Sequence, residues 1–197
     1  MKNVEKNLKY IKEVKAENIE WTKLFGAYSC GRKIGEDIKN DNLLNLKILK
    51  NIRGEIEHQS TLWTLTPFAM IFLIRQLEKE YGEKKEEYCY ILKIYKLIVE
   101  TIKDIKNEYF VEESIEDLEV YPEMRCLFNI DIDLEDFDDE EEYIEAHFEE
   151  EDLEREYNSS FYYTNFVIEN SKDIIKGLLN SKDEEIKNLV LEILENF

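Results

Sequence analysis

The chain has 197 residues, of which 43% are hydrophobic, 12% aromatic and 37% charged, and its formal net charge is −20 at pH 7. This hydrophobic content excludes disorder over the whole length, and a chain of this size is expected to form one domain. With only 6 glycines and 2 prolines, the composition excludes turn-rich β-sandwiches and barrels and favours long helices.

Periodic apolar residues predict four helices in the first part of the chain. The first covers residues 4–14, the second begins after Asn18 and ends near Gly31, the third covers 32–39 and the fourth covers 42–56. On the second helix, the predicted inward face consists of Trp21, Leu24, Phe25 and Tyr28.

A fifth helix is predicted to start at Thr66 and Pro67, because threonine is a common N-cap and proline is favoured at the first helical position. It continues to about residue 82. Its first half is apolar nearly all round, so we expect this helix at the centre of the core. A sixth, amphipathic helix is predicted over 84–109.

Two helices, over 160–179 and 183–196, are predicted to close the chain. The stretches 34–52 and 174–194 share one pattern, a short helix, a turn that contains asparagine and a second amphipathic helix. Such internal similarity is typical of helical-repeat proteins. The sequence therefore predicts an all-α fold.

Charge is distributed unevenly along the chain. Residues 1–110 carry 20 Lys and Arg against 17 Asp and Glu, whereas residues 111–197 carry 6 against 29. Within 131–156, 16 acidic residues accompany one basic residue, Arg155. Such a field repels nucleic acid and anionic membranes, so we expect neither as a direct partner and favour a basic protein.

The single domain, 1–197, is predicted to have three parts. They are a near-neutral helical module at 1–110, an acidic insertion at 111–157 that is most acidic near 131–157, and a closing helix pair at 158–197.

Cysteine use and the first residues predict a cytoplasmic protein. Cys30, Cys89 and Cys126 are odd in number and widely spaced, which is typical of reduced thiols. The lysine-rich first residues lack the continuous apolar stretch of a signal peptide. The longest uncharged run, 58–74, contains Pro67, and we do not interpret it as a membrane-spanning helix.

Residues 20–73 carry a recognisable set of motifs. Trp21, Leu24 and the run Ala-Tyr-Ser at 27–29 precede a predicted helix, and EHQSTLWTLTPFAMIFL follows at 57–73. This resembles the opening module of a bacterial HEAT-like family, which reads W-x-x-L-x-x-A-Y-G, a helix, then H-Q-G-[ST]-[LV]-[YW]-x-A-T-P-x-A-x-P-F-L. The chain departs from the module at Ser29 and Ser60, where the family has glycine, and at Ile71, where proline is frequent. The resemblance implies HEAT-like stacked antiparallel helix pairs, an α-α superhelix, and a role like that of toxin-immunity proteins.

The acidic segment 131–156 is interleaved with large apolar residues, which solvating tails generally lack. Two interpretations remain open. One is a solvated insertion whose rings tie it to its own core, and the other is a binding surface for a basic protein. The residues predicted to contact such a partner are Asp131, Asp133, Asp138, Asp139, Glu140, Glu141, Glu142, Tyr143, Phe148, Glu149, Glu150 and Glu151.

Two motifs invite a chemical interpretation. His58-Gln59 is the strongest catalytic candidate, yet nothing orients a cysteine or His147 toward His58, so we interpret the pair as polar caps between two helices. Residues 131–142 place acids at several positions of a calcium loop, but Asp136 stands where the tight turn needs glycine. We therefore expect no catalytic residue, metal site or cofactor.

The leading hypothesis is a non-catalytic inhibitor that binds protein, namely an immunity protein that neutralises a basic toxin such as a nuclease. Its carboxylates would cover the cationic substrate groove of the toxin and exclude nucleic acid. One alternative is an acidic nucleic-acid mimic of the anti-restriction or anti-CRISPR type. The others are a generic HEAT-like scaffold and an enzyme that uses a metal ion or His58.

Overall fold

A computed structural model describes residues 2–80, 82–109, 123–128, 132–150 and 153–197. The α-helices are α1 (Lys2–Glu13), α2 (Arg32–Lys39), α3 (Leu46–Ile56), α4 (Leu65–Leu77), α5 (Lys85–Tyr109), α7 (Glu140–Glu150), α8 (Leu153–Glu169), α9 (Lys172–Gly177) and α10 (Glu184–Leu194). Short 3-10 helices are η1 (Ala16–Asn18), η2 (Trp21–Lys23), η3 (Met124–Phe128), η4 (Leu134–Asp136) and η5 (Leu178–Asn180). Apart from one hairpin of β1 (Glu57–His58) and β2 (Thr61–Leu62), these residues confirm the predicted all-α class.

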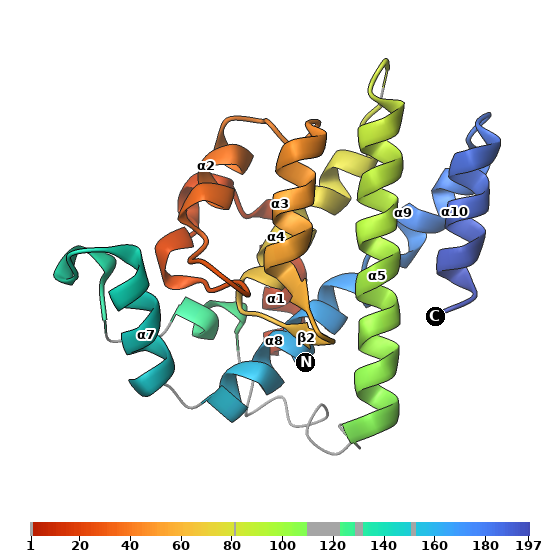
Figure 1. The fold of residues 1–197 in the computed structure, drawn as a ribbon. Coiled ribbons are helices and arrows are strands. Elements are labelled where there is room, and N and C mark those ends of the chain that lie inside the picture. Colours follow the sequence, from red (N-terminus) through yellow and green to blue (C-terminus); the bar gives the residue numbers. More distant parts are fainter. Residues whose placement is uncertain (1, 81, 110–122, 129–131, 151–152) are drawn as a thin grey trace.

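Helix α4 lies in the core, as its apolar sequence predicts. It is buried on nearly every side and packs against α3, α5 and α8. The long helix α5 stands between the α3–α4 layer and the α9–α10 pair (Figure 1), and contacts α3, α4 and α10. No helix within the described ranges is both long and apolar enough to cross a lipid bilayer.

Polar contacts fix the closing helices against α5. The buried hydroxyl of Tyr95 lies 2.8 Å from the Ser171 hydroxyl, at the start of α9. At the start of α10, the Asp183 side chain caps the helix and its second carboxylate oxygen lies 2.7 Å from Lys85 Nζ. The predicted closing pair is therefore present, but α8 begins earlier than expected and α9 is a separate short helix.

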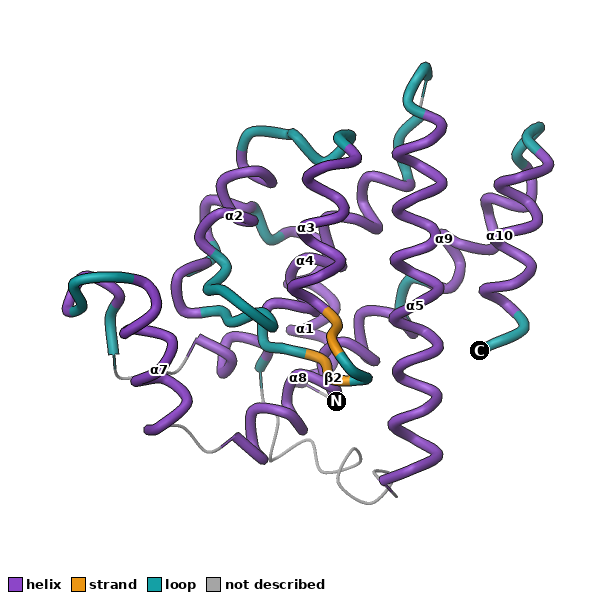
Figure 2. The backbone as a smooth tube through the Cα atoms, in the orientation of Figure 1, coloured by secondary structure: helices purple, strands orange, loops and turns teal. Residues whose placement is uncertain are grey.

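The predicted second helix, from Asn18 to Gly31, is wrong. The chain instead forms η1, η2 and a turn closed by a backbone bridge between Phe25 and Cys30 (teal in Figure 2). Distant side chains take the backbone N–H groups that a helix would use. Phe25 N–H donates to Thr64 Oγ1 at 2.8 Å, and the Glu55 carboxylate accepts from two residues of the turn.

The junction between α3 and α4 is a hairpin, drawn in orange in Figure 2. Helix α4 begins at Leu65, so Thr66 lies in the first turn and is not the N-cap. Its hydroxyl accepts from Trp63 N–H at 3.0 Å and donates to the Ile56 carbonyl at 2.5 Å. Thr66 thus joins the last turn of α3 to the first turn of α4.

Candidate protein-binding surface

Apolar side chains fasten the acidic segment to the helical body. Tyr143 of α7 is fully buried, its hydroxyl donates to the Thr22 carbonyl at 3.0 Å, and its ring centroid lies 5.4 Å from that of Phe25. Leu134 of η4 and Cys30 complete this small buried cluster. The half-buried residues packed against it are Ile132, Phe137 and Ile144.

His147 is the second attachment of α7, one helical turn after Tyr143. The imidazole is fully buried and stacks on the Phe25 ring, with centroids 3.6 Å apart and planes 3° from parallel. Its Nε2 lies 3.1 Å from Glu156 Oε2, which connects α7 to α8. Since Tyr143 and His147 share one face, the opposite face of α7 is turned outward.

The prediction that Tyr143 contacts a partner is wrong for this conformation, because the ring has no exposed surface. Burying an aromatic side chain stabilises the fold by about 1.5–3 kcal/mol. The Tyr143 ring therefore stabilises the free protein and is not available to a partner. Phe148 is half-buried, with its ring centroid 6.1 Å from that of Trp63. Asp131 and Glu151 lie outside the described residues, as do the side chains of Glu149 and Glu150.

Three of the predicted carboxylates hold the segment in place. Asp139 caps α7, with Oδ1 accepting from the N–H groups of Glu141 at 2.9 Å and Glu142 at 3.0 Å. Glu140 Oε1 accepts from Cys30 N–H at 3.1 Å, and Asp133 pairs with Lys23 at 3.3 Å. Acids in the first turn also interact favourably with the positive end of the helix dipole.

Five exposed acids at the start and on the outer side of α7 form what we call the acidic face, defined as Asp138, Asp139, Glu141, Glu142 and Glu145. All five side chains are exposed, and in the described part of the chain no lysine or arginine forms an ion pair with them. Figure 1 shows α7 at one edge of the molecule, opposite α10. These charges therefore lie on a helix that is docked against the body, and none of them is paired with a lysine or arginine that the structure describes.

An exposed aromatic residue, Tyr28, lies on the turn beside the acidic face. Its side chain is 64% exposed, and its hydroxyl lies 3.0 Å from Nδ1 of His58. The carboxylate of Glu55, only 7% exposed, accepts from Tyr28 N–H at 3.0 Å and from Ser29 N–H at 3.1 Å. Gly26 permits this approach, because a Cβ there would lie 2.5 Å from Glu55 Oε2.

His58 and Gln59 do not act as the predicted caps. The His58 ring meets the Tyr28 hydroxyl, and Gln59 occupies the hairpin turn with φ of 50°. Sequence reasoning missed this site because it placed Tyr28 on the inward face of a helix. One feature of the sequence could have indicated the turn. Ser60 stands where the resembled module has glycine, and its φ of 61° is a backbone conformation that favours glycine.

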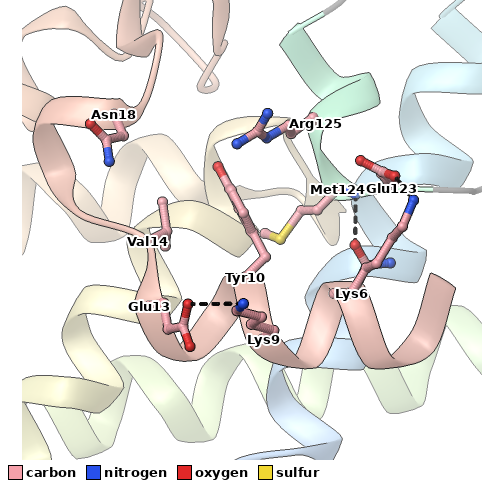
Figure 3. Close-up of a pocket in the computed structure, with 10 residues that line it drawn as sticks. Lys6, Lys9, Tyr10, Glu13, Val14, Asn18, Glu123, Met124 and Arg125 are labelled. Atoms are coloured by element: carbon pink, nitrogen blue, oxygen red, sulfur yellow. Dashed lines mark hydrogen bonds and ion pairs between the residues drawn. The ribbon is translucent and has the colours of Figure 1, made fainter. Parts of the chain in front are cut away.

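A cavity of about 490 Å³ opens between α1 and η3 (Figure 3). Lys6 pairs there with Glu123 at 2.6 Å, and Lys9 lies 3.9 Å from Glu13. The residues lining it include no histidine or cysteine and none of the predicted partner contacts.

No disulfide joins Cys30, Cys89 and Cys126, and the Cys126 thiol lies 3.6 Å from the Tyr163 hydroxyl. Burial raises the pKa of the Cys30 thiol to about 11, so this group stays protonated at neutral pH and is a poor nucleophile. In the ranges described, no group of three or more His, Cys, Asp and Glu side chains is arranged to hold a metal ion.

Comparisons with family models, curated proteins and solved structures found no match to this chain. The resemblance of residues 20–73 to the HEAT-like module therefore stays a prediction. Function is inferred from the residues and their geometry.

Proposed function

We propose that the protein is a non-catalytic inhibitor that binds a basic protein through the acidic face, most simply an immunity protein that neutralises a cationic toxin such as a nuclease. One observation carries the proposal. The apolar residues of the acidic segment pack inward, whereas Asp138, Glu141, Glu142 and Glu145 are exposed and pair with no described lysine or arginine.

Such a surface is unfavourable for the fold by itself. Glu141 and Glu145 lie four residues apart on α7, and like charges at this spacing repel by about 0.2–0.5 kcal/mol per pair. The buried side chains of Tyr143 and His147 keep the helix docked in spite of this repulsion. A charged face that weakens the free protein is typical of a surface whose favourable interactions form with a partner.

Charge complementarity gives the mechanism. The negative field attracts a basic protein over a distance of about one Debye length, ~8 Å at physiological salt, and speeds the encounter. Because α7 is already folded and docked, little conformational entropy is lost on binding. Carboxylates over a cationic substrate groove then exclude nucleic acid from it.

The resemblance of residues 20–73 adds to the proposal, since it implies HEAT-like stacked helix pairs and a family that includes proteins like toxin-immunity proteins. The α2–α3 and α9–α10 segments are the helix–turn–helix units that such stacking would use. We include this arrangement and a cytoplasmic location in the proposal.

The test uses the protein encoded beside this chain's gene, with affinity measured by calorimetry. A variant carrying Asp138→Lys, Glu141→Lys, Glu142→Lys and Glu145→Lys is expected to bind at least about 100-fold more weakly. The matched control reverses four exposed acids elsewhere, Glu17, Glu36, Asp173 and Glu195, and thus makes the same change in net charge.

The control variant is expected to keep most of its affinity. Equal losses in both variants would show that only overall charge matters, and unchanged binding by the α7 variant would show that the acidic face is not the interface. Either result would overturn the proposal.

A further inference from the structure

The turn that carries Tyr28 is continuous with the acidic face. Glu140, the first residue of α7, accepts a hydrogen bond from Cys30 N–H at 3.1 Å. Tyr28 is two residues from Cys30, so their Cα atoms are at most about 7 Å apart. The backbone of the Tyr28 turn and the first turn of α7 therefore lie near enough for one partner to contact both.

Tyr28 is exposed but held in one place. Glu55 fixes the backbone on both sides of it, and His58 holds the hydroxyl, with the two rings edge to face at 5.1 Å between centroids. A ring that stays 64% exposed adds little hydrophobic stabilisation to the fold. The buried carboxylate of Glu55 and the ring of His58 therefore both orient the exposed Tyr28 side chain.

The hairpin that presents His58 is strained. Gln59 and Ser60 have φ of 50° and 61°, a region that disfavours residues with a Cβ by about 1–2 kcal/mol each. This backbone places His58 opposite Thr61 and against Tyr28. Strain of this kind is frequent where a side chain is positioned for binding.

Three other aromatic rings among the described residues have a cation placed over them. Arg125 lies 5.6 Å from the Tyr10 centroid and Arg75 lies 5.1 Å from that of Phe72. Lys172 lies 4.3 Å from the Phe197 centroid. No lysine or arginine of the described ranges is placed in this way over Tyr28, although the carboxylates of Glu55 and Glu140 both accept hydrogen bonds from its turn.

We propose that Tyr28 is the anchor that receives an arginine side chain of the basic partner. The guanidinium stacks on the open face of the ring and donates hydrogen bonds to the carboxylates at the edge of the acidic face. Arginine fits better than lysine, because its planar group stacks on an aromatic ring and meets a carboxylate with two parallel N–H groups. The inference rests on the proposed function, because it takes the partner to be a basic protein.

The experiment is an amide NMR titration at low salt with the peptide acetyl-Gly-Arg-Gly-amide and its lysine counterpart. We expect the largest shift changes at residues 27–30 and 57–60, and weaker binding of the lysine peptide. In Tyr28→Leu, affinity for the arginine peptide should fall about five- to tenfold, whereas Tyr28→Phe, which keeps the ring, should retain most of it. Tyr157→Leu, at another exposed tyrosine, should bind as the parent protein does.

Unchanged affinity of Tyr28→Leu, or equal binding of the two peptides, would overturn the anchor. Shift changes confined to α7 would also overturn it, while leaving the acidic face as the binding surface. Absence of saturable shifts on both the turn and α7 would count against the anchor and the proposed function together.

Discussion

At the scale of single residues, Glu55 shapes the turn that carries Tyr28. Its carboxylate lies under the 26–30 turn and accepts hydrogen bonds from the backbone N–H groups of Tyr28 and Ser29, which form no helical hydrogen bonds. Ser60, on the neighbouring hairpin, adopts a backbone conformation that suits glycine. Both residues act on the position of Tyr28, one through hydrogen bonds and the other through His58.

Replacing Glu55 by alanine should lower the free energy of unfolding by about 2 kcal/mol, since two donors lose a buried acceptor. Urea denaturation measures this change. Glu57→Ala is the control, because Glu57 accepts a single hydrogen bond, from Ser60 N–H, at an exposed position. A Glu55→Ala effect no larger than that of Glu57→Ala would contradict the role given to Glu55.

Ser60→Gly should raise the free energy of unfolding by about 1 kcal/mol, because glycine adopts positive φ without a steric penalty. The matched control is Ser29→Gly. Ser29 also stands where the HEAT-like module has glycine, but its φ is not positive. If thermal denaturation gave the two variants the same stabilisation, backbone strain at Ser60 would not be the cause.

Helix α7 is attached to the rest of the fold by a small number of contacts. It is rich in like charges, and two of its side chains, Tyr143 and His147, are fully buried against other parts of the chain. Its first turn is capped by Asp139 and attached to Cys30 through Glu140. Helix α4, in contrast, is apolar nearly all round and belongs to the main core.

We expect Tyr143→Ala to release α7 before the rest of the fold. The substitution removes a buried ring and should cost about 3–5 kcal/mol of local stability. In hydrogen–deuterium exchange, the amides of α7 should lose protection while those of α4 and α5 keep theirs. Glu145→Ala, on the exposed face of the same helix, serves as the control. Uniform loss of protection in Tyr143→Ala would show that α7 does not unfold separately.

For the whole molecule, buried tyrosines make stability sensitive to alkaline pH. Burial raises the pKa of Tyr95, Tyr143 and Tyr163 above the ordinary value near 10. The folded state thus binds these protons more tightly than the unfolded state does. Their contribution to stability is complete below about pH 10 and is lost as the pH rises above it.

The urea midpoint is therefore expected to fall as the pH rises from about 10 to about 12. Tyrosine absorbance recorded along the same titration should show a late-ionising group of residues. Tyr143→Phe removes one of these groups and should make the fall less steep. A urea midpoint that did not change over this range would contradict the burial of the three hydroxyl groups.

Local sequence patterns determined most of the helices. The spacing of apolar residues predicts α1, α2, α5 and α10 to within a few residues, because a helix forms its hydrogen bonds and its apolar face within a short stretch of chain. It also predicts α3 and α4, but places the start of α3 too early and the end of α4 too late. The same reasoning found the acidic segment and its rings. It left open whether those rings point toward a partner or toward the core.

Only the tertiary structure determined which side chains of the candidate surface are exposed and which are buried. The 16–30 segment has helical spacing, yet Thr64 and Glu55, remote in sequence, bind its N–H groups and turn Tyr28 outward. Tyr143 likewise is buried because Phe25 and the Thr22 carbonyl lie beside it in space. A side chain's exposure depends on neighbours brought together from distant parts of the chain, and periodicity along a single segment carries no information about them.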